Sequence, residues 1–151
     1  MIRLGNSRRK ILVEFISSLL ILLFVYAAVS KLISFHEFRV TIGQSPLLTP
    51  FASWLAWLVP IGELIVSVLL AFPAFRLLGL FLSFALMVLF TGYIVAILLF
   101  ADFVPCSCGG VLEAMSWGQH LWFNGFFVLL AVGGIFMYES PDSTEFLRDE
   151  C

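Results

Sequence analysis

Charged residues are scarce in this sequence. Only 12% of its 151 residues are Asp, Glu, Lys or Arg, whereas 62% are hydrophobic, and the mean hydropathy is +1.09. A chain of this composition has too little polar surface to cover a soluble globule. The composition therefore excludes a soluble domain and predicts an integral membrane protein.

An excess of positive charge is also missing. Eight Lys and Arg residues stand against ten Asp and Glu residues, so the formal net charge is −2, and no basic stripe runs along the chain. Proteins that bind nucleic acid need such a stripe to neutralise phosphates. We therefore expect no nucleic-acid partner and look for partners in the lipid bilayer, among quinones and among other proteins.

Four long apolar runs are present, and each is long enough to cross the bilayer. A span needs about 20 apolar residues to cross a hydrocarbon core of roughly 30 Å. Glu14 is the only charge in the first run and Glu63 the only one in the second, and the last two runs carry none. The predicted spans are about residues 11–30, 51–72, 77–101 and 119–138.

These spans predict an all-α integral membrane protein, a four-helix bundle within one domain over residues 1–138. The first run follows a basic cluster, as a signal peptide would, but it is longer than a typical apolar signal region, so we expect it to stay as a membrane helix. Residues 31–40 alternate apolar and charged side chains, which predicts a short amphipathic interfacial segment after the first span. Residues 139–151 form a short acidic tail.

The distribution of Lys and Arg predicts the orientation. Cytoplasmic flanks of membrane proteins carry the excess of these residues. With both termini cytoplasmic, only Lys31 and Arg39 face outward, and six basic residues face the cytoplasm: Arg3, Arg8, Arg9, Lys10, Arg76 and Arg148. The prediction is a multi-pass protein of the bacterial inner membrane, with residues 102–118 facing the periplasm.

Two cysteines lie in that predicted periplasmic segment. Cys106 and Cys108 are separated by one residue and followed by Gly109 and Gly110. A disulfide between cysteines so close together closes a small, strained ring, and strain makes the bond easier to reduce. The glycines leave room for another protein's thiol to approach. This pattern is typical of a disulfide that exchanges with a partner.

Three polar or aromatic residues follow the cysteines. Trp117, His120 and Asn124 have the spacing of one helix face if the last span is helical from about Ser116. In this interpretation His120 accepts the proton of an attacking thiol or holds a thiolate. Asn124 orients the imidazole or bonds a quinone carbonyl, and Trp117 belongs to the same candidate cofactor-binding face.

Other interpretations of these residues stay open. The cysteine pair is also compatible with a structural disulfide, although the strain of the small ring disfavours it. His120 and Asn124 are also compatible with a helix cap and with hydrogen bonds to neighbouring helices. Cys106, Cys108 and His120 are also suitable ligands for copper(I) or zinc, although a closed zinc site normally has four ligands.

Lys31 and Glu63 form the second candidate functional site. Glu63 lies within the second span, where an ionisable side chain is costly unless it is paired or functional. Lys31 closes the first span, and its long stem is able to reach inward. We therefore predict an ion pair between them, which serves either helix packing or proton transfer.

Several of these segments resemble a known family. Four features resemble the four-helix DoxX-like superfamily: Ser30-Lys31-Leu32, Phe38, Ser45-Pro46-Leu47-Leu48 and Pro60-Ile61-Gly62-Glu63-Leu64. The segment 105–110, with Trp117 and His120 after it, is most similar to the methylamine utilisation protein MauE branch. The resemblance covers about residues 25–136.

The resemblance implies a redox role at the membrane. MauE proteins are similar in layout to the membrane thiol oxidases DsbB and vitamin K epoxide reductase, which implies that Cys106 and Cys108 are the redox pair and that the partner is a periplasmic thioredoxin-like protein. This chain has one such pair, whereas those oxidases relay electrons between two. Lys31 and Glu63 match polar helix positions of the branch.

The resulting hypothesis is an inner-membrane thiol–disulfide oxidoreductase that supports disulfide formation in periplasmic proteins, with a quinone or another protein as the candidate electron acceptor. The alternatives are a membrane assembly subunit with a structural cysteine pair and a membrane protein that handles copper or zinc.

Overall fold

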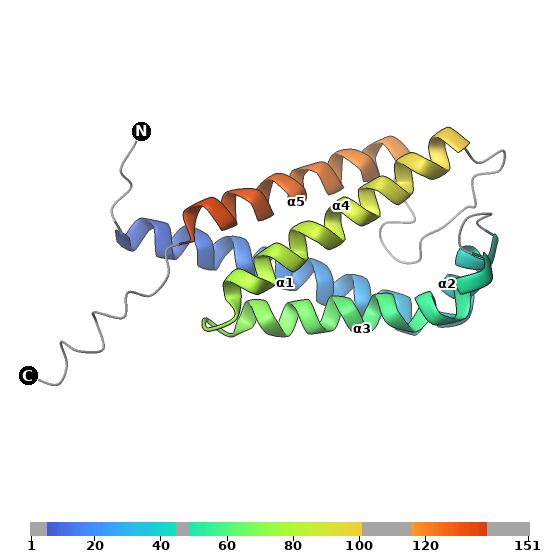
Figure 1. Ribbon diagram of the computed structural model, residues 1–151, viewed down its shortest axis with the longest axis horizontal. Coiled ribbons are helices and arrows are strands. Elements are labelled where there is room, and N and C mark those ends of the chain that lie inside the picture. Colours follow the sequence, from blue (N-terminus) through green and yellow to red (C-terminus); the bar gives the residue numbers. More distant parts are fainter. Residues whose placement is uncertain (1–5, 45–48, 101–115, 139–151) are drawn as a thin grey trace, which may run out of the picture.

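The described part of the chain is entirely helical wherever it has regular structure (Figure 1). The computed structural model describes residues 6–44, 49–100 and 116–138. Its elements are α1 (Asn6–Ile33), α2 (Phe35–Gln44), a short 3-10 helix η1 (Thr49–Phe51), α3 (Ala52–Ala71), α4 (Arg76–Phe100) and α5 (Trp117–Met137). The predicted all-α fold is confirmed.

Four of these helices are long and apolar enough to cross a membrane. The candidate spans are Ser7–Ile33, Thr49–Ala71, Arg76–Ala96 and Gly118–Met137. They coincide with the four predicted runs, so the predicted four-helix membrane bundle is confirmed. Which side of the membrane each terminus occupies stays a prediction.

The amphipathic segment after the first span is the helix α2. It begins at Phe35 rather than at Lys31, because the residues from Lys31 to Ile33 continue α1. Backbone hydrogen bonds cross the junction, since the Ser34 N–H donates to the Ser30 carbonyl at 3.1 Å and the Phe38 N–H donates to the Ser34 carbonyl at 2.9 Å. Lys31 therefore belongs to the last turn of α1.

The bundle is built from two helix pairs (Figure 1). In one pair α1 packs along α3, and in the other α4 packs along α5. A tight turn at Phe72–Phe75 joins α3 to α4, and the Phe75 N–H donates to the Phe72 carbonyl at 3.1 Å. Contacts of α3 with α4 and of α1 with α5 hold the two pairs together.

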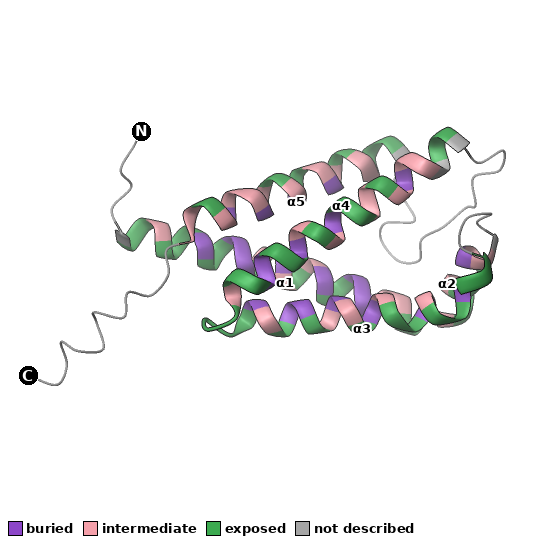
Figure 2. Cartoon of the chain, in the orientation of Figure 1, coloured by how far each residue is buried: buried purple, intermediate pink, exposed green. Residues whose placement is uncertain are grey.

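The helices have buried residues toward the centre of the bundle and exposed residues on its outside (Figure 2). Apolar side chains are found in both places. Leu20, Phe24, Leu70 and Leu80 are fully buried between the pairs. The outward faces carry exposed large apolar side chains, such as Phe136, which is 80% exposed. An apolar exterior is the arrangement that a bilayer solvates.

The two pairs approach each other most closely near the α3–α4 turn. A Cβ atom added to Gly79 on α4 would lie 2.9 Å from the backbone nitrogen of Leu70 on α3, and one added to Gly134 on α5 would lie 3.2 Å from a methyl group of Ile16 on α1. At Gly79 an added side chain would meet backbone and push the helices apart, whereas at Gly134 it would meet only side-chain methyl groups.

The first turn of α5 is fixed by a capping box. The Ser116 hydroxyl accepts a hydrogen bond from the Gln119 N–H at 3.4 Å, and the Gln119 side chain accepts one from the Ser116 N–H at 2.9 Å. This reciprocal pair satisfies two N–H groups that a helix start otherwise leaves open. The predicted helix start around Ser116 is confirmed, and His120 lies one turn inside it.

Candidate functional site

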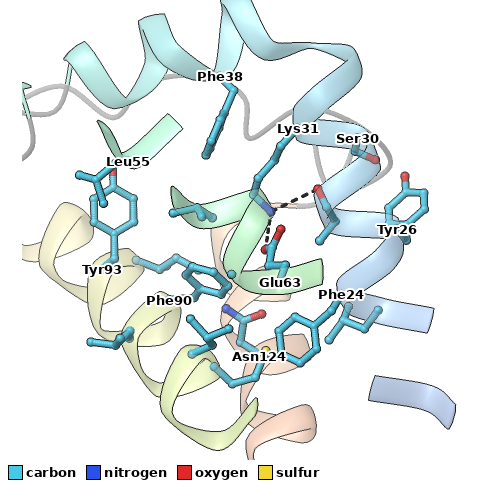
Figure 3. Close-up of a pocket in the computed structure, with 18 of the residues that line it drawn as sticks. Phe24, Tyr26, Ser30, Lys31, Phe38, Leu55, Glu63, Phe90, Tyr93 and Asn124 are labelled. Atoms are coloured by element: carbon cyan, nitrogen blue, oxygen red, sulfur yellow. Dashed lines mark hydrogen bonds and ion pairs between the residues drawn. The ribbon is translucent and has the colours of Figure 1, made fainter. Parts of the chain in front are cut away.

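A cavity of about 520 Å³ lies in the half of the bundle remote from the α3–α4 turn (Figure 3). All five α-helices contribute to its wall, and most of the lining side chains are apolar. Its polar lining residues are Tyr26 and Ser30 from α1, Lys31 at the end of α1, Glu63 on α3, Tyr93 on α4, and His120 and Asn124 on α5.

Lys31 and Glu63 form an ion pair at this cavity. The Lys31 Nζ donates to the Glu63 Oε1 at 2.8 Å and to the Ala27 carbonyl at 3.4 Å (Figure 3). The Glu63 side chain is completely buried, whereas the Lys31 side chain is 20% exposed. The predicted ion pair is therefore present, and it joins the end of α1 to the middle of α3.

The pair keeps unused hydrogen-bonding capacity. Glu63 Oε2 is buried and has no hydrogen-bond partner among the described residues. An ammonium group has three N–H donors, and the described residues accept two hydrogen bonds from Lys31. The Phe38 and Phe90 ring centroids lie 5.9 and 5.7 Å from the Nζ atom, within the range of cation–π attraction. The ammonium is thus held among aromatic rings, with one donor left over.

His120 and Asn124 bring α5 into the same site. They lie one helical turn apart and both line the cavity, so these two of the three residues of the predicted face lie on one side of α5. Asn124 is buried and His120 is half-buried. The amide of Asn124 offers both donors and an acceptor, and the imidazole offers one ring nitrogen of each kind when it is neutral. The structure therefore brings His120, Asn124, Lys31 and Glu63 around one space.

Other predicted site residues lie outside what the structure describes. Cys106 and Cys108 fall between the end of α4 and the start of α5, in residues 101–115. Trp117 is the first residue of α5, but its side chain is also outside the description. Within the described ranges no three His, Cys, Asp or Glu residues come together as a metal site would need. The metal hypothesis depends on the two cysteines and stays untested.

Sequence reasoning did not find the aromatic part of the wall. Phe38 on α2 and Phe90 on α4 flank the ammonium, but Phe is common throughout the chain and gave no distinguishing signal. Tyr26 and Tyr93 also line the cavity, and each places a polar hydroxyl within an otherwise apolar run. These hydroxyls were the sequence feature that could have indicated a cavity beside their helices.

Comparison with protein families agrees with this architecture. The family model described as methylamine utilisation protein MauE matches residues 9–137, from the start of α1 to the end of α5. The chain belongs to the MauE family. No curated protein and no solved structure matches it. This MauE-family protein is a multi-pass membrane protein, and its family is named for methylamine utilisation.

Proposed function

We propose that this MauE-family protein exchanges thiols and disulfides with a thioredoxin-like protein on the periplasmic side of the inner membrane. In this role it supports disulfide formation in periplasmic proteins. The chemistry acts on protein cysteines and not on methylamine, for which the family is named.

One observation carries the proposal beyond the sequence motif. The helix that follows the cysteines begins with a capped turn, and that turn presents His120 to the wall of a cavity that also contains Asn124 and the Lys31–Glu63 pair. The helix that follows the Cys106-Ser107-Cys108 segment in the chain thus carries a proton-accepting side chain at a mostly apolar cavity with a few polar groups.

The proposed reaction balances two electrons and two protons. One thiol of the partner attacks the Cys106–Cys108 disulfide and forms a mixed disulfide, and the partner's second thiol then resolves it. The partner leaves with a disulfide, and Cys106 and Cys108 remain as two thiols. His120 accepts the proton of the attacking thiol and passes it to the cysteine sulfur that is released, because imidazole changes protonation near neutral pH. The two thiols must next be reoxidised by an acceptor in the membrane.

Single cysteine substitutions test this reaction. We expect both Cys106→Ser and Cys108→Ser to lose oxidation of the reduced partner, because each variant lacks the disulfide that the partner's thiol attacks. The wild type should accumulate a mixed disulfide with a partner whose second, resolving cysteine is changed to serine. Non-reducing electrophoresis after rapid thiol alkylation measures both outcomes. Cys151→Ser is the matched control, since Cys151 lies in the acidic tail, and it should behave like the wild type. Unchanged oxidation of the partner in both CxC variants would instead favour an assembly subunit with a structural cysteine pair.

A further inference from the structure

We infer that the cavity binds a lipid-soluble quinone and that the Lys31 ammonium, held in place by Glu63, donates a hydrogen bond to one of its carbonyl oxygens. The inference rests on the proposed function, because it names the acceptor that reoxidises the two thiols. It is argued from the cavity, from the ion pair and from the balance of the reaction.

The size and lining of the cavity limit which ligands are able to bind. A volume of about 520 Å³ lies within the usual range of about 300–1,000 Å³ for sites of small organic molecules. The cavity lies within helices that span the membrane, and its wall is mostly aliphatic and aromatic. A ligand that enters it must therefore be soluble in lipid and have an apolar body.

The ion pair restricts the polar part of the ligand. Among the described residues, Lys31 Nζ uses two of its three donors on Glu63 and Ala27, and Phe38 and Phe90 flank the ammonium without accepting a conventional hydrogen bond. A donor without an acceptor in an apolar cavity is unfavourable. A ligand with a carbonyl oxygen at this position would complete the site. The unpartnered Oε2 of Glu63 is an acceptor among the described residues, and the hydroxyl of the quinol, not the carbonyl of the quinone, would donate to it.

The proposed reaction indicates which lipid-soluble carbonyl compound the ligand is, because the ligand must also accept electrons and protons. Reoxidation of Cys106 and Cys108 breaks two S–H bonds and forms one S–S bond, so two electrons and two protons must leave. A quinone takes up both electrons in its ring and both protons on its carbonyl oxygens, and it becomes the quinol. The same oxygens accept hydrogen bonds in the oxidised form, which matches the donor that Lys31 offers.

Direct binding to the full-length protein tests the assignment. The probe is a benzoquinone with a decyl tail, and the comparison ligand is decylbenzene, which lacks the carbonyl oxygens. Titration calorimetry in detergent micelles measures both affinities. We expect the quinone to bind the wild type at least about tenfold more tightly than decylbenzene, a factor that corresponds to about 1.4 kcal/mol. Equal affinities would overturn the proposal, because the cavity would then bind any apolar chain.

Two variants locate the site. The double variant Lys31→Met/Glu63→Gln removes the donor without leaving a buried charge alone, and it should weaken quinone binding at least about tenfold. Gly62→Leu should also weaken it, since Gly62 lines the cavity and an added Cβ meets no atom within 4 Å. Gly92→Leu is its matched control, because Gly92 has the same free space but does not line the cavity, and its affinity should stay unchanged. Wild-type affinity in both cavity variants would overturn the inference.

The thiol reaction is measured in parallel, so that the two proposals fail separately. A Cys106→Ser/Cys108→Ser variant should lose exchange with the partner and keep quinone binding, and Lys31→Met/Glu63→Gln should keep the mixed disulfide and lose quinone binding. Thiol exchange in a wild type that does not bind quinone would refute the cavity assignment alone. Quinone binding without thiol exchange would refute the proposed function and with it the acceptor role.

Discussion

Loss of Lys31 should destabilise the protein more than loss of Glu63. Lys31→Met leaves a carboxylate that is completely buried and has no other ion-pair partner among the described residues. Removing one partner of a buried ion pair typically costs about 3–5 kcal/mol. Glu63→Gln leaves a carbonyl that still accepts from Nζ, and the Lys31 side chain is already 20% exposed and able to extend toward water. We expect this substitution to cost about 1–2 kcal/mol, in the range of a hydrogen bond to a charged group.

The double variant measures how much of the stability comes from the interaction between Lys31 and Glu63. At an Nζ–Oε1 distance of 2.8 Å, the gross Coulomb attraction is about 6 kcal/mol for an effective dielectric constant of about 20, and most of it offsets the desolvation of the two ions. Lys31→Met/Glu63→Gln removes the attraction and the desolvation together. It should therefore cost less than the two single changes combined, with a coupling energy of about 2–3 kcal/mol.

Reversible unfolding in mixed micelles, titrated with dodecyl sulfate and followed by circular dichroism, measures these free energies. Arg39→Met is the control, because Arg39 is an exposed cation whose hydrogen bond to the Ser53 hydroxyl, at 2.9 Å, is also exposed. It should change the free energy of unfolding by no more than about 0.5 kcal/mol. A coupling energy below about 0.5 kcal/mol, or a larger cost for Glu63→Gln than for Lys31→Met, would refute the reasoning.

Two further predictions concern how the helices are held. Gly79→Ala should cost about 1–3 kcal/mol, because its Cβ would lie 2.9 Å from the backbone nitrogen of Leu70, whereas Gly92→Ala, with no atom within 4 Å, should be neutral or stabilise by up to about 1 kcal/mol. The same unfolding titration checks both, and equal effects would contradict the close approach. Ser116→Ala should cost about 0.5–2 kcal/mol by removing the cap that Gln119 completes. Hydrogen exchange should then become faster in the first turn of α5, and unchanged exchange would show that the cap is dispensable.

The helices were predictable because charge and proline interrupt apolar runs sharply. The predicted span 51–72 differs by one residue at each end from α3, Ala52–Ala71. The first helix is longer than predicted, since α1 runs from Asn6 to Ile33 rather than over 11–30. Its extra turns carry basic and polar residues, which an apolar run excludes but a helix tolerates where it leaves the hydrocarbon core. Hydropathy therefore indicates the part of a helix that lies in lipid and not where the helix ends.

The ion pair was predictable for a different reason. Glu63 is buried in an apolar span, and few cations are within reach of that depth, so Lys31 was the natural partner. The cavity beside it was not predictable, because its wall consists mostly of residues that also serve as packing or lipid-facing positions. Phe90, for example, follows the same apolar pattern as residues of α4 that are exposed. Only the relative placement of the two helix pairs distinguishes a residue that lines the cavity from one that packs in the core or faces lipid.

The position of the cavity follows from where the helix pairs meet closely and where they do not. Gly79 and Gly134 allow close contact near the α3–α4 turn. In the opposite half, Lys31 and Glu63 tie α1 to α3, while α4 and α5 contribute a separate part of the wall. The space between the pairs thus lies toward the start of α5, the helix that directly follows the Cys106-Ser107-Cys108 segment in the chain. A ligand between the pairs would contact both, so binding of an electron acceptor should also stabilise the bundle by linkage.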